Sequence, residues 1–343
     1  MLKTALIQRI ATPCRILLPM PSQTAAPARP FRRKLLAWYD LHRRNLPWRE
    51  STDPYRVWVS EIMLQQTRVA AVLEHYARFM KRFPTVEALA NAREQSVLAV
   101  WSGLGYYHRA RRMHQAAKVI AREHEGQFPS RFDDWLGLPG IGKYTAAAIA
   151  SIAFGEPVAV VDGNVERVLA RLEGSELGNG SAWIRAQALL DPRRPGDFNQ
   201  AMMELGATIC TPRSPQCLLC PVSTFCVTRG EQPAGKQAPR NRRQLVYALL
   251  EKQGAVLLLQ RAADARLMAG MWELPQLAEA PADSVPLALL RHSITDTDYD
   301  VLVFRGAELH IANSRWFTPK QWRKAALTGL ARKILMKVAQ QPA

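Results

Sequence analysis

The segment Leu138-Pro139-Gly140-Ile141-Gly142-Lys143-Tyr144-Thr145, followed by Ala146-Ala147-Ala148-Ile149-Ala150, predicts two helices joined by a tight turn. Proline and glycine end the first helix, and the alanine-rich run continues the second one. The two glycines leave backbone N–H groups uncovered at the N-terminus of the second helix, an arrangement that binds anions. Gly140 and Gly142 are therefore candidate contacts to a phosphate, although a glycine-rich turn by itself joins many helix pairs.

The sequence on both sides of this turn has the apolar spacing of helices. Apolar residues recur three and four positions apart in segments such as 57–73, and breakers such as Phe83-Pro84-Thr85 and Gly155-Glu156-Pro157 separate these segments. From Phe31 to about Cys226 we expect an all-α body of about ten short helices.

Four of the five cysteines, Cys210, Cys217, Cys220 and Cys226, lie within one short stretch. Secreted proteins held by disulfides spread their cysteines widely, so this clustering indicates a metal site in a reducing compartment. The spacing C-x6-C-x2-C-x5-C differs from the two separated C-x-x-C pairs of zinc ribbons. Four thiolates in one compact loop suit an iron–sulfur cubane better than zinc, although zinc also accepts four cysteines.

The charge balance favours a polyanionic partner. Lysine and arginine number 46 against 29 aspartates and glutamates, which gives a net charge of +17. Such a charge is attracted to a nucleic-acid backbone, whereas ferredoxin-like electron carriers are small and acidic. No apolar run approaches the roughly 18 residues that a membrane span needs.

The first 34 residues carry seven basic residues and no acidic one. We expect a disordered basic arm over residues 1–30, although an organelle transit peptide has a similar composition. Residues 228–243 are polar and rich in glycine, proline and basic residues, which indicates a linker.

The pattern after Gln244 changes from helices to strands. Short apolar runs at 245–250 and 256–259 flank Gln253-Gly254 and predict a β-hairpin, and 300–304 is a further strand candidate. Thr318-Pro319 predicts a helix start, and 327–338 reads as a terminal helix. The second domain is therefore expected to be small and α+β.

One acidic residue lies inside an otherwise apolar helical stretch, Glu61 in Tyr55-Arg56-Val57-Trp58-Val59-Ser60-Glu61-Ile62-Met63-Leu64-Gln65-Gln66-Thr67. A carboxyl group in such surroundings should have a raised pKa, which a general acid needs. A second one follows the hairpin in Val160-Val161-Asp162-Gly163-Asn164-Val165. These segments, Leu46-Pro47-Trp48-Arg49, the hairpin and the cysteine loop resemble the adenine DNA glycosylases (the MutY family) of the helix-hairpin-helix, endonuclease III superfamily, and the resemblance runs from about Phe31 to residue 340.

The resemblance implies a mostly α fold, an all-α helix-hairpin-helix glycosylase body over 31–227 and a small α+β Nudix-like domain over 244–343. It implies one 4Fe-4S cluster on Cys210, Cys217, Cys220 and Cys226. It also implies catalytic roles for Glu61, Asp162, Tyr144 and Asn164. The implied substrate-binding residues are Trp48, Arg49, Gln65, Gln66, Tyr106, Leu138, Gly140, Gly142, Gln200 and Thr295; Tyr107, beside Tyr106, is hard to tell from it by alignment.

Tyr144 separates two mechanisms. Relatives that also cut the DNA strand carry a Schiff-base lysine in Leu-Pro-Gly-x-Gly-x-Lys-Thr-Ala, and Tyr144 matches that lysine. A phenol cannot form an imine, so we expect a monofunctional enzyme, with Lys143 directed elsewhere on the helix. The alternatives are an oxidised-pyrimidine glycosylase with lyase activity, which needs that lysine, and a cluster-bearing DNA-binding protein without catalysis.

The implied substrate is double-stranded DNA with adenine opposite 8-oxoguanine or guanine. Met268-Ala269-Gly270-Met271-Trp272-Glu273-Leu274-Pro275 resembles a segment of the family's Nudix-like reader, while the clustered Arg and Glu pattern of Nudix pyrophosphatases is absent. Where the family has Phe-Ser-His or Phe-Thr-His, this chain has Ile294-Thr295-Asp296, so a milder lesion preference is expected. We expect a monomer that binds no membrane and acts in the bacterial cytoplasm, at the nucleoid.

Overall fold

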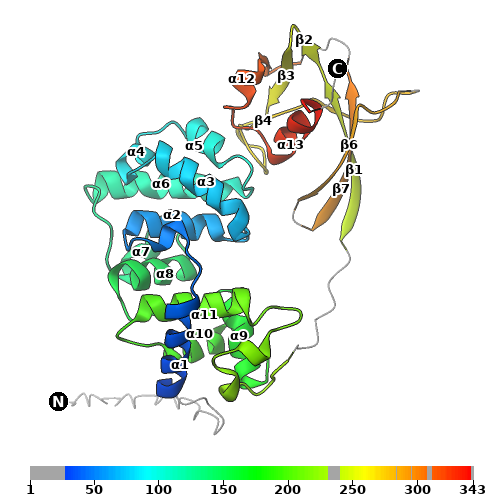
Figure 1. Ribbon diagram of the computed structural model, residues 1–343. Helices are drawn as coiled ribbons and strands as arrows, with labels where there is room; N and C mark the ends of the chain where they lie inside the picture. Colours follow the sequence, from blue (N-terminus) through cyan, green and yellow to red (C-terminus); the bar gives the residue numbers. More distant parts are fainter. Residues whose placement is uncertain (1–27, 231–239, 283, 295, 307–310, 341–343) are drawn as a thin grey trace, which may run out of the picture.

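The computed structural model describes residues 28–230, 240–282, 284–294, 296–306 and 311–340. They form a helical body and a separate domain built on strands, as Figure 1 shows. No helix among these residues is long and apolar enough to cross a membrane. The expected arm over residues 1–30 falls almost entirely outside the described residues, but its last three residues belong to the first helix.

The described part of the body is entirely helical, as its sequence pattern predicts. Its elements are α1 (Ala28–His42), η1 (Pro47–Arg49), α2 (Pro54–Leu64), α3 (Val69–Arg82), α4 (Val86–Ala90), α5 (Glu94–Trp101), α6 (Tyr107–Glu123), α7 (Phe132–Leu136), α8 (Lys143–Phe154), α9 (Gly163–Glu173), α10 (Asn179–Leu189), α11 (Pro195–Thr208), η2 (Cys217–Leu219) and η3 (Ser223–Phe225).

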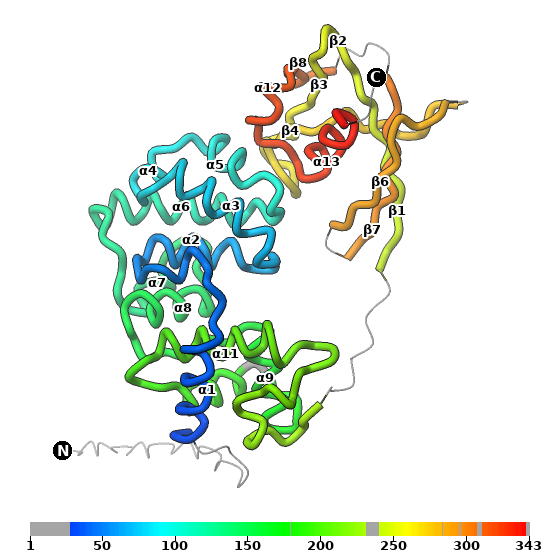
Figure 2. Tube along the Cα trace, in the orientation of Figure 1, coloured from blue at the N-terminus to red at the C-terminus, as the bar shows by residue number. Residues whose placement is uncertain are grey.

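The body has two hydrophobic cores. One core joins α2 to α8, with Trp58, Trp101 and Trp135 fully buried in it. The other joins α1 with α9, α10, α11 and the cysteine loop, around Phe31 and Phe198. The helix α1 therefore packs in the second core, α2 to α8 form the first core, and α9 to α11 pack in the second core again. Figures 1 and 2 show the result, with α1 lying beside α11. Elements from both cores meet where the functional side chains lie.

Local signals fix the ends of the helices that carry these side chains. The carboxylate of Asp53 caps α2 by accepting from the backbone N–H of Arg56 at 3.0 Å, and Pro54 occupies the first turn. Gly142 precedes α8, and Gly155 ends it in the left-handed conformation. These signals fix where α2 and α8 begin and where α8 ends.

The second domain is α+β, as expected. Its strands are β1 (Asn241–Leu249), β2 (Glu251–Lys252), β3 (Ala255–Gln260), β4 (Trp272–Glu273), β5 (Gln276–Leu277), β6 (Ala288–Ile294), β7 (Thr297–Arg305) and β8 (Ser314–Phe317), and its helices are α12 (Pro319–Trp322) and α13 (Gly329–Val338). One sheet has the order β5-β1-β7-β6, with β1 and β7 parallel, and the other pairs β3 with β2, β4 and β8.

Two sequence expectations need correction here. Strand β1 begins at Asn241, inside the expected linker, because its first residues pair in register with Thr297 and the residues that follow on β7. The hairpin around Gln253-Gly254 is formed by β2 and β3, whereas most of the first apolar run belongs to the other sheet. The pairing of β1 with β7 joins positions far apart in sequence, which local turn signals do not report.

The second domain contacts the body around the end of α5 and along α6. Ser102 donates through Oγ to the carbonyl of Leu327 at 2.8 Å and accepts from Nε of Arg332 at 2.9 Å. Arg111 on α6 donates to the carbonyl of Ala269, and Met271 is fully buried in the first core of the body. The two domains therefore share both polar and apolar contacts.

Candidate active site

Glu61 lies on the third turn of α2 and lines a cavity of about 160 Å³ between the two cores. Its side chain is buried, with a residue exposure of 6%. Burial raises the pKa of Glu61 to about 7, and the charge of Asp162 acts in the same direction, while the hydroxyl of Tyr144 and the charge of Arg49 act against it. The raised pKa expected from the apolar surroundings in the sequence is confirmed.

Tyr144, in the first turn of α8, donates through its hydroxyl to Oε2 of Glu61 at 2.6 Å. Burial and the adjacent Glu61 carboxyl hold the pKa of Tyr144 well above its usual value, so the phenol keeps its proton. Its neighbour Lys143 is exposed, and its Nζ lies 4.1 Å from the ring centroid of Trp183 on α10. The ammonium group is therefore directed away from Glu61, as expected.

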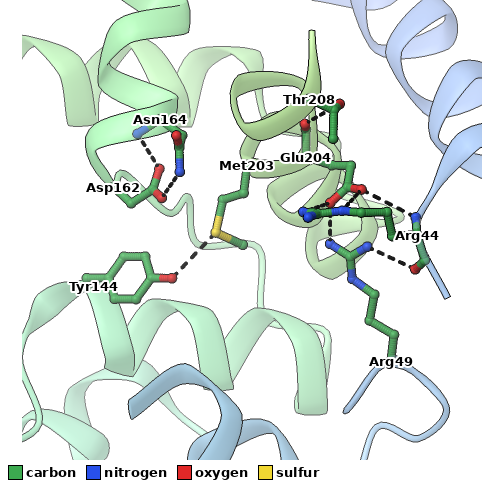
Figure 3. A network of polar contacts seen from close by, with 8 residues as sticks. All are labelled: Arg44, Arg49, Tyr144, Asp162, Asn164, Met203, Glu204 and Thr208. Carbon is green, nitrogen blue, oxygen red and sulfur yellow. Dashed lines mark hydrogen bonds and ion pairs between the residues drawn. The ribbon is translucent and has the colours of Figure 1, made fainter. Parts of the chain in front are cut away.

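Asp162 is the residue before α9 and caps that helix. Its Oδ1 accepts from the backbone N–H groups of Asn164 at 2.9 Å and Val165 at 2.8 Å. Its Oδ2 accepts from the side-chain amide of Asn164 at 2.9 Å, a contact drawn in Figure 3. Asp162 and Asn164 line the same cavity as Glu61 and Tyr144, so the structure brings all four expected catalytic residues together.

The wall of this cavity contains Trp48, Arg49 and Gln200, as expected from the sequence. It also contains residues that the sequence analysis missed. Met203 on α11 accepts a weak hydrogen bond from the Tyr144 hydroxyl at 3.5 Å. Glu204 on the same helix is joined to Arg49 and to Arg44 (Figure 3). An Arg-Glu pair is too common on protein surfaces for its sequence to identify these positions.

A wider groove of about 810 Å³ opens beside the cavity and shares Tyr144, Asp162 and Asn164 with it. Gln65, Gln66 and Tyr106 line this groove. Gln66 and Tyr106 are both held in the left-handed backbone conformation, with φ of 55° and 49°. Tyr106 is 41% exposed, whereas Tyr107 is 4% exposed and contacts the second domain, which separates two neighbours that alignment alone confuses.

Arg109 donates hydrogen bonds to the backbone segments that line this groove. It is a further residue that the sequence analysis missed. Its buried guanidinium donates to the carbonyls of Ile62, Met63 and Gln65 and, on its other side, to Oγ1 of Thr67 and the carbonyl of Gly105. Burial lowers the pKa of Arg109 to about 10. One side chain thus ties the last turn of α2 to the loop before α6.

The hairpin turn needs glycine at one of its two positions. Gly140 has φ of +76°, and a Cβ there would lie 2.3 Å from Cβ of Arg112. Gly142 is exposed and has open space around it, which keeps the start of α8 accessible. Leu138 is 6% exposed and packs in the first core, so its side chain is not available to a ligand.

Cys210, Cys217, Cys220 and Cys226 line one cavity after α11. Sγ of Cys210 accepts from Nη1 of Arg171 at 3.3 Å, and Sγ of Cys226 accepts from the backbone N–H of Arg229 at 3.5 Å. Burial raises the pKa of Cys220 to about 11, and the other three cysteines add to the effect. Four soft sulfur donors with a guanidinium and a backbone N–H beside them fit an iron–sulfur cluster.

Arg167 links the cysteine loop to the residues that are expected to be catalytic. Its guanidinium donates to the carbonyl of Cys210 at 2.9 Å, to the side-chain oxygen of Asn164 at 2.9 Å and to the carbonyl of Gly206 at 2.7 Å. The glycine at position 206 lets α11 lie close to Asn164 on α9, since a Cβ at Gly206 would lie 2.7 Å from Cβ of Asn164. The loop that holds the cysteines and the residues that hold Asp162 are therefore one connected structure.

Thr295 lies outside the described residues. Ile294, next to it on β6, lines a cavity of about 400 Å³ between the two domains, together with Tyr106 and His292. The end of β6 and the exposed ring of Tyr106 therefore line one interdomain cavity.

Comparisons with known proteins agree with this geometry. Residues 59–186 match the family of HhH-GPD superfamily base excision DNA repair proteins, and residues 210–226 match the iron–sulfur binding domain of endonuclease III. A solved thermostable thymine-DNA glycosylase has a TM-score of 0.55, with 31% identity, over 58% of this chain and 94% of that chain. The fold, the site and these matches thus define the class of helix-hairpin-helix base excision DNA repair proteins with an iron–sulfur loop.

Within this class, three curated relatives are adenine DNA glycosylases. That of the rat is 35% identical, over 89% of this chain and 77% of its own length. That of Mycobacterium tuberculosis is 40% identical, over 72% of this chain and 84% of its own length. That of the mouse is also 40% identical, and this chain spans 61% of its length. The chain belongs to the adenine DNA glycosylase family, and the cysteine loop is its 4Fe-4S site.

Proposed function

We propose that this protein is a monofunctional adenine DNA glycosylase, which hydrolyses the N-glycosidic bond of adenine opposite 8-oxoguanine or guanine in double-stranded DNA. The observation that carries the proposal is Glu61. It is a buried carboxyl group with a pKa of about 7, and it shares a cavity with Asp162. It is hydrogen-bonded to a tyrosine at the position where a lyase needs a lysine.

An adenine in a duplex has to leave the base stack before its glycosidic bond can enter this cavity. In its protonated form, Glu61 then donates its proton to N7 of the base. The electrons of the bond between N9 and C1′ move to the base, which leaves as neutral adenine. The hydroxyl of Tyr144 holds Oε2 of Glu61 in place during this transfer.

Departure of the base leaves positive charge on the deoxyribose, and Asp162 stabilises that charge in the manner of the second carboxylate of a glycosidase. Asn164 and the start of α9 fix the orientation of Asp162 through three hydrogen bonds. Water then adds at C1′ and loses a proton, which returns to the ionised carboxylate of Glu61, so that the products are free adenine and an abasic site. No lysine lines the cavity or the groove among the described residues, which supports hydrolysis without strand cleavage.

The groove beside the cavity suits the opened duplex. Gln66 and Tyr106 are exposed there and fill or wedge the stack that the adenine leaves. The uncovered start of α8 at Gly142 binds a DNA phosphate, helped by the net charge of +17. When bound to the four cysteines, the 4Fe-4S cluster fixes their loop as a cross-link.

The second domain reads the base opposite the adenine, as a Nudix-like lesion-recognition domain. The cavity between the domains, with Ile294 and Tyr106 in its lining, supports this role. Thr295 supplies a hydroxyl for the lesion. Asp296 places a carboxylate near the DNA, which makes the preference for 8-oxoguanine milder than in relatives with an aromatic residue and a histidine in this loop.

The test is base release under single-turnover conditions on duplexes with adenine opposite 8-oxoguanine, guanine or thymine, each analysed with and without alkali. We expect strand breaks only after alkali, with the fastest release opposite 8-oxoguanine. If adenine stays in place on all three duplexes while a thymine-glycol duplex is nicked without alkali, the lyase reading replaces this proposal.

A further inference from the structure

Glu204 is a buried carboxylate shared by two arginines, and the mechanism above does not use it. Its side chain is 1% exposed. Oε1 accepts from Nε of Arg44 at 2.6 Å, and Oε2 accepts from Nη2 of Arg44 at 2.8 Å and from Nη2 of Arg49 at 2.9 Å (Figure 3). Burial works to raise the pKa of Glu204, but the hydrogen bonds from Arg44 and the charge of Arg49 prevail, so its pKa is lowered. Glu204 therefore remains an anion.

Arg49 connects this anion to the base cavity. Its side chain is 12% exposed and lines the cavity together with Glu61. Nη1 of Arg49 donates to the carbonyl of Arg44 at 3.2 Å, and Nη2 donates to Glu204. Two of the five N–H donors of the guanidinium are used in these contacts, which leaves donors for a base in the cavity.

An arginine beside Glu61 whose charge is not balanced by an anion would hinder proton donation by Glu61. The charge of Arg49 favours the ionised form of Glu61, whereas proton donation to the base needs the neutral form. The carboxylate of Glu204 offsets the charge of Arg49 at a distance of 2.9 Å. Arg44, the second cation on Glu204, is 39% exposed, so solvent screens part of its charge.

We propose that Glu204 is a positioning residue of the excision reaction: it holds the guanidinium of Arg49 against the wall of the base cavity and matches its charge, so that Arg49 can bind the base while Glu61 keeps its proton. This inference rests on the proposed function. Glu204 acts through Arg49, because both of its oxygens are already occupied by the two arginines.

The other charged and titratable groups around Glu61 come from several elements. Tyr144 comes from α8, Asp162 from the start of α9, Arg49 from η1, and Arg44 from the segment between α1 and η1. The helix α3 contributes only Val69 to the cavity, and Arg109 on α6 contacts backbone carbonyls beyond Glu61. Among the residues described, α11 adds Glu204 as its single charged group in the cavity.

The test is the pH dependence of single-turnover adenine release by the E204Q variant of the full chain with its cluster. The limb on which the rate falls as pH rises reports loss of the Glu61 proton. The amide cannot match the charge of Arg49, so we expect this limb to move to lower pH by on the order of one unit. E204D keeps the negative charge and should return the limb toward its original position.

Two comparisons separate this role from a structural one. In an R49M background, the limb should lie at higher pH, and adding E204Q should move it by much less than in the native background. E173Q removes a carboxylate from the ion pair of Glu173 with Arg185 at 2.6 Å, which lies outside the cavity, and should leave the limb in place. Thermal unfolding and the cluster absorbance report whether each variant is folded.

The proposal is overturned if E204Q lowers the rate equally at every pH, or if it moves the limb equally with and without Arg49. If E204Q does not fold, the R49M single variant still tests the proposal. An unmoved limb in R49M would show that the charge of Arg49 does not affect the protonation of Glu61, and the proposal would then fail. If the native chain releases no adenine at all, the proposed function fails instead, and the two failures are distinguishable.

Discussion

Glu61 shows how a single position acquires its chemistry from its surroundings. Its neighbours on α2 are buried and mostly apolar, and the partner that contacts it, Tyr144, comes from a helix more than eighty positions later in the sequence. Burial supplies the raised pKa, and Tyr144 and Arg49 moderate it. The resulting acid is half protonated near neutral pH, which suits a group that must donate a proton and then be protonated again in each turnover.

The rate of adenine release should depend on pH through Glu61. Because the acid form is active and its pKa is about 7, the single-turnover rate should be level below pH 7 and fall about tenfold per unit well above it. E61Q should be slower by roughly 10²- to 10⁴-fold and lack this limb. A native profile that stays level through pH 9, with E61Q fully active, would contradict the assignment.

Y144F should move the same limb to higher pH. The hydroxyl of Tyr144 donates to Glu61 and lowers its pKa, so removing it favours the protonated form. The shift is measured by single-turnover release between pH 5 and 9. Y107F is the matched control, because the hydroxyl of Tyr107 contacts the carbonyl of Leu327 outside the cavity. Equal shifts in both variants would mean that the hydrogen bond to Glu61 is not the cause.

At the scale of elements, the last turn of α2 is a junction. The carbonyl groups of Ile62, Met63 and Gln65 would need other partners without Arg109, because α2 ends there. The same guanidinium lies 5.3 Å from the ring centroid of Tyr106. A helix end, a left-handed turn and an exposed aromatic ring thus depend on one cation from α6.

R109M should lower the free energy of unfolding by about 2–4 kcal/mol, since it leaves several buried carbonyls without donors. It should also slow adenine release, because Gln66 and Tyr106 lose their support. Urea unfolding and single-turnover kinetics measure the two effects. R122M removes the same charge from an exposed position on α6 and should change neither by much. Native-like kinetics in R109M would show that the junction does not serve the reaction.

At the scale of the whole molecule, two cores and a docked second domain meet around one groove. Arg332 and Ser102 join the domains, and the cavity between them has Tyr106 and Ile294 in its lining. The position of the second domain is therefore set by contacts that lie next to the groove. The position of the second domain should therefore affect the preference for the base opposite the adenine more than it affects proton transfer from Glu61.

R332M should reduce the ratio of adenine release opposite 8-oxoguanine to that opposite guanine by several-fold, because an interdomain hydrogen bond worth about 1–3 kcal/mol is lost. The pH limb set by Glu61 should stay in place. K337M is a control on the same helix, since Lys337 donates to the carbonyl of Leu289 within its own domain. If R332M and K337M give the same ratio as the native protein, docking does not govern the discrimination.

The sequence alone suffices for the features that local patterns encode. Apolar spacing predicts the helices, the spacing of Cys210 to Cys226 predicts the cluster, and the glycine turn predicts the hairpin. Glu61 is unusual as a carboxyl group in an apolar helical segment, but it becomes a candidate acid only because the flanking segment Tyr55 to Thr67 resembles the family. The other candidate catalytic residues, Asp162, Tyr144 and Asn164, follow only from the resemblance to the family, because each lies in a short segment that matches a family motif.

The remaining features depend on tertiary packing. Arg44 and Glu204 are 160 positions apart, and they meet because α1 returns to the core of α11. Arg109 contacts a turn more than forty positions earlier, and β1 pairs with β7 across the second domain. Arginine and glutamate are most often solvated, so only the packed chain shows which of them are buried together and what their charges act on.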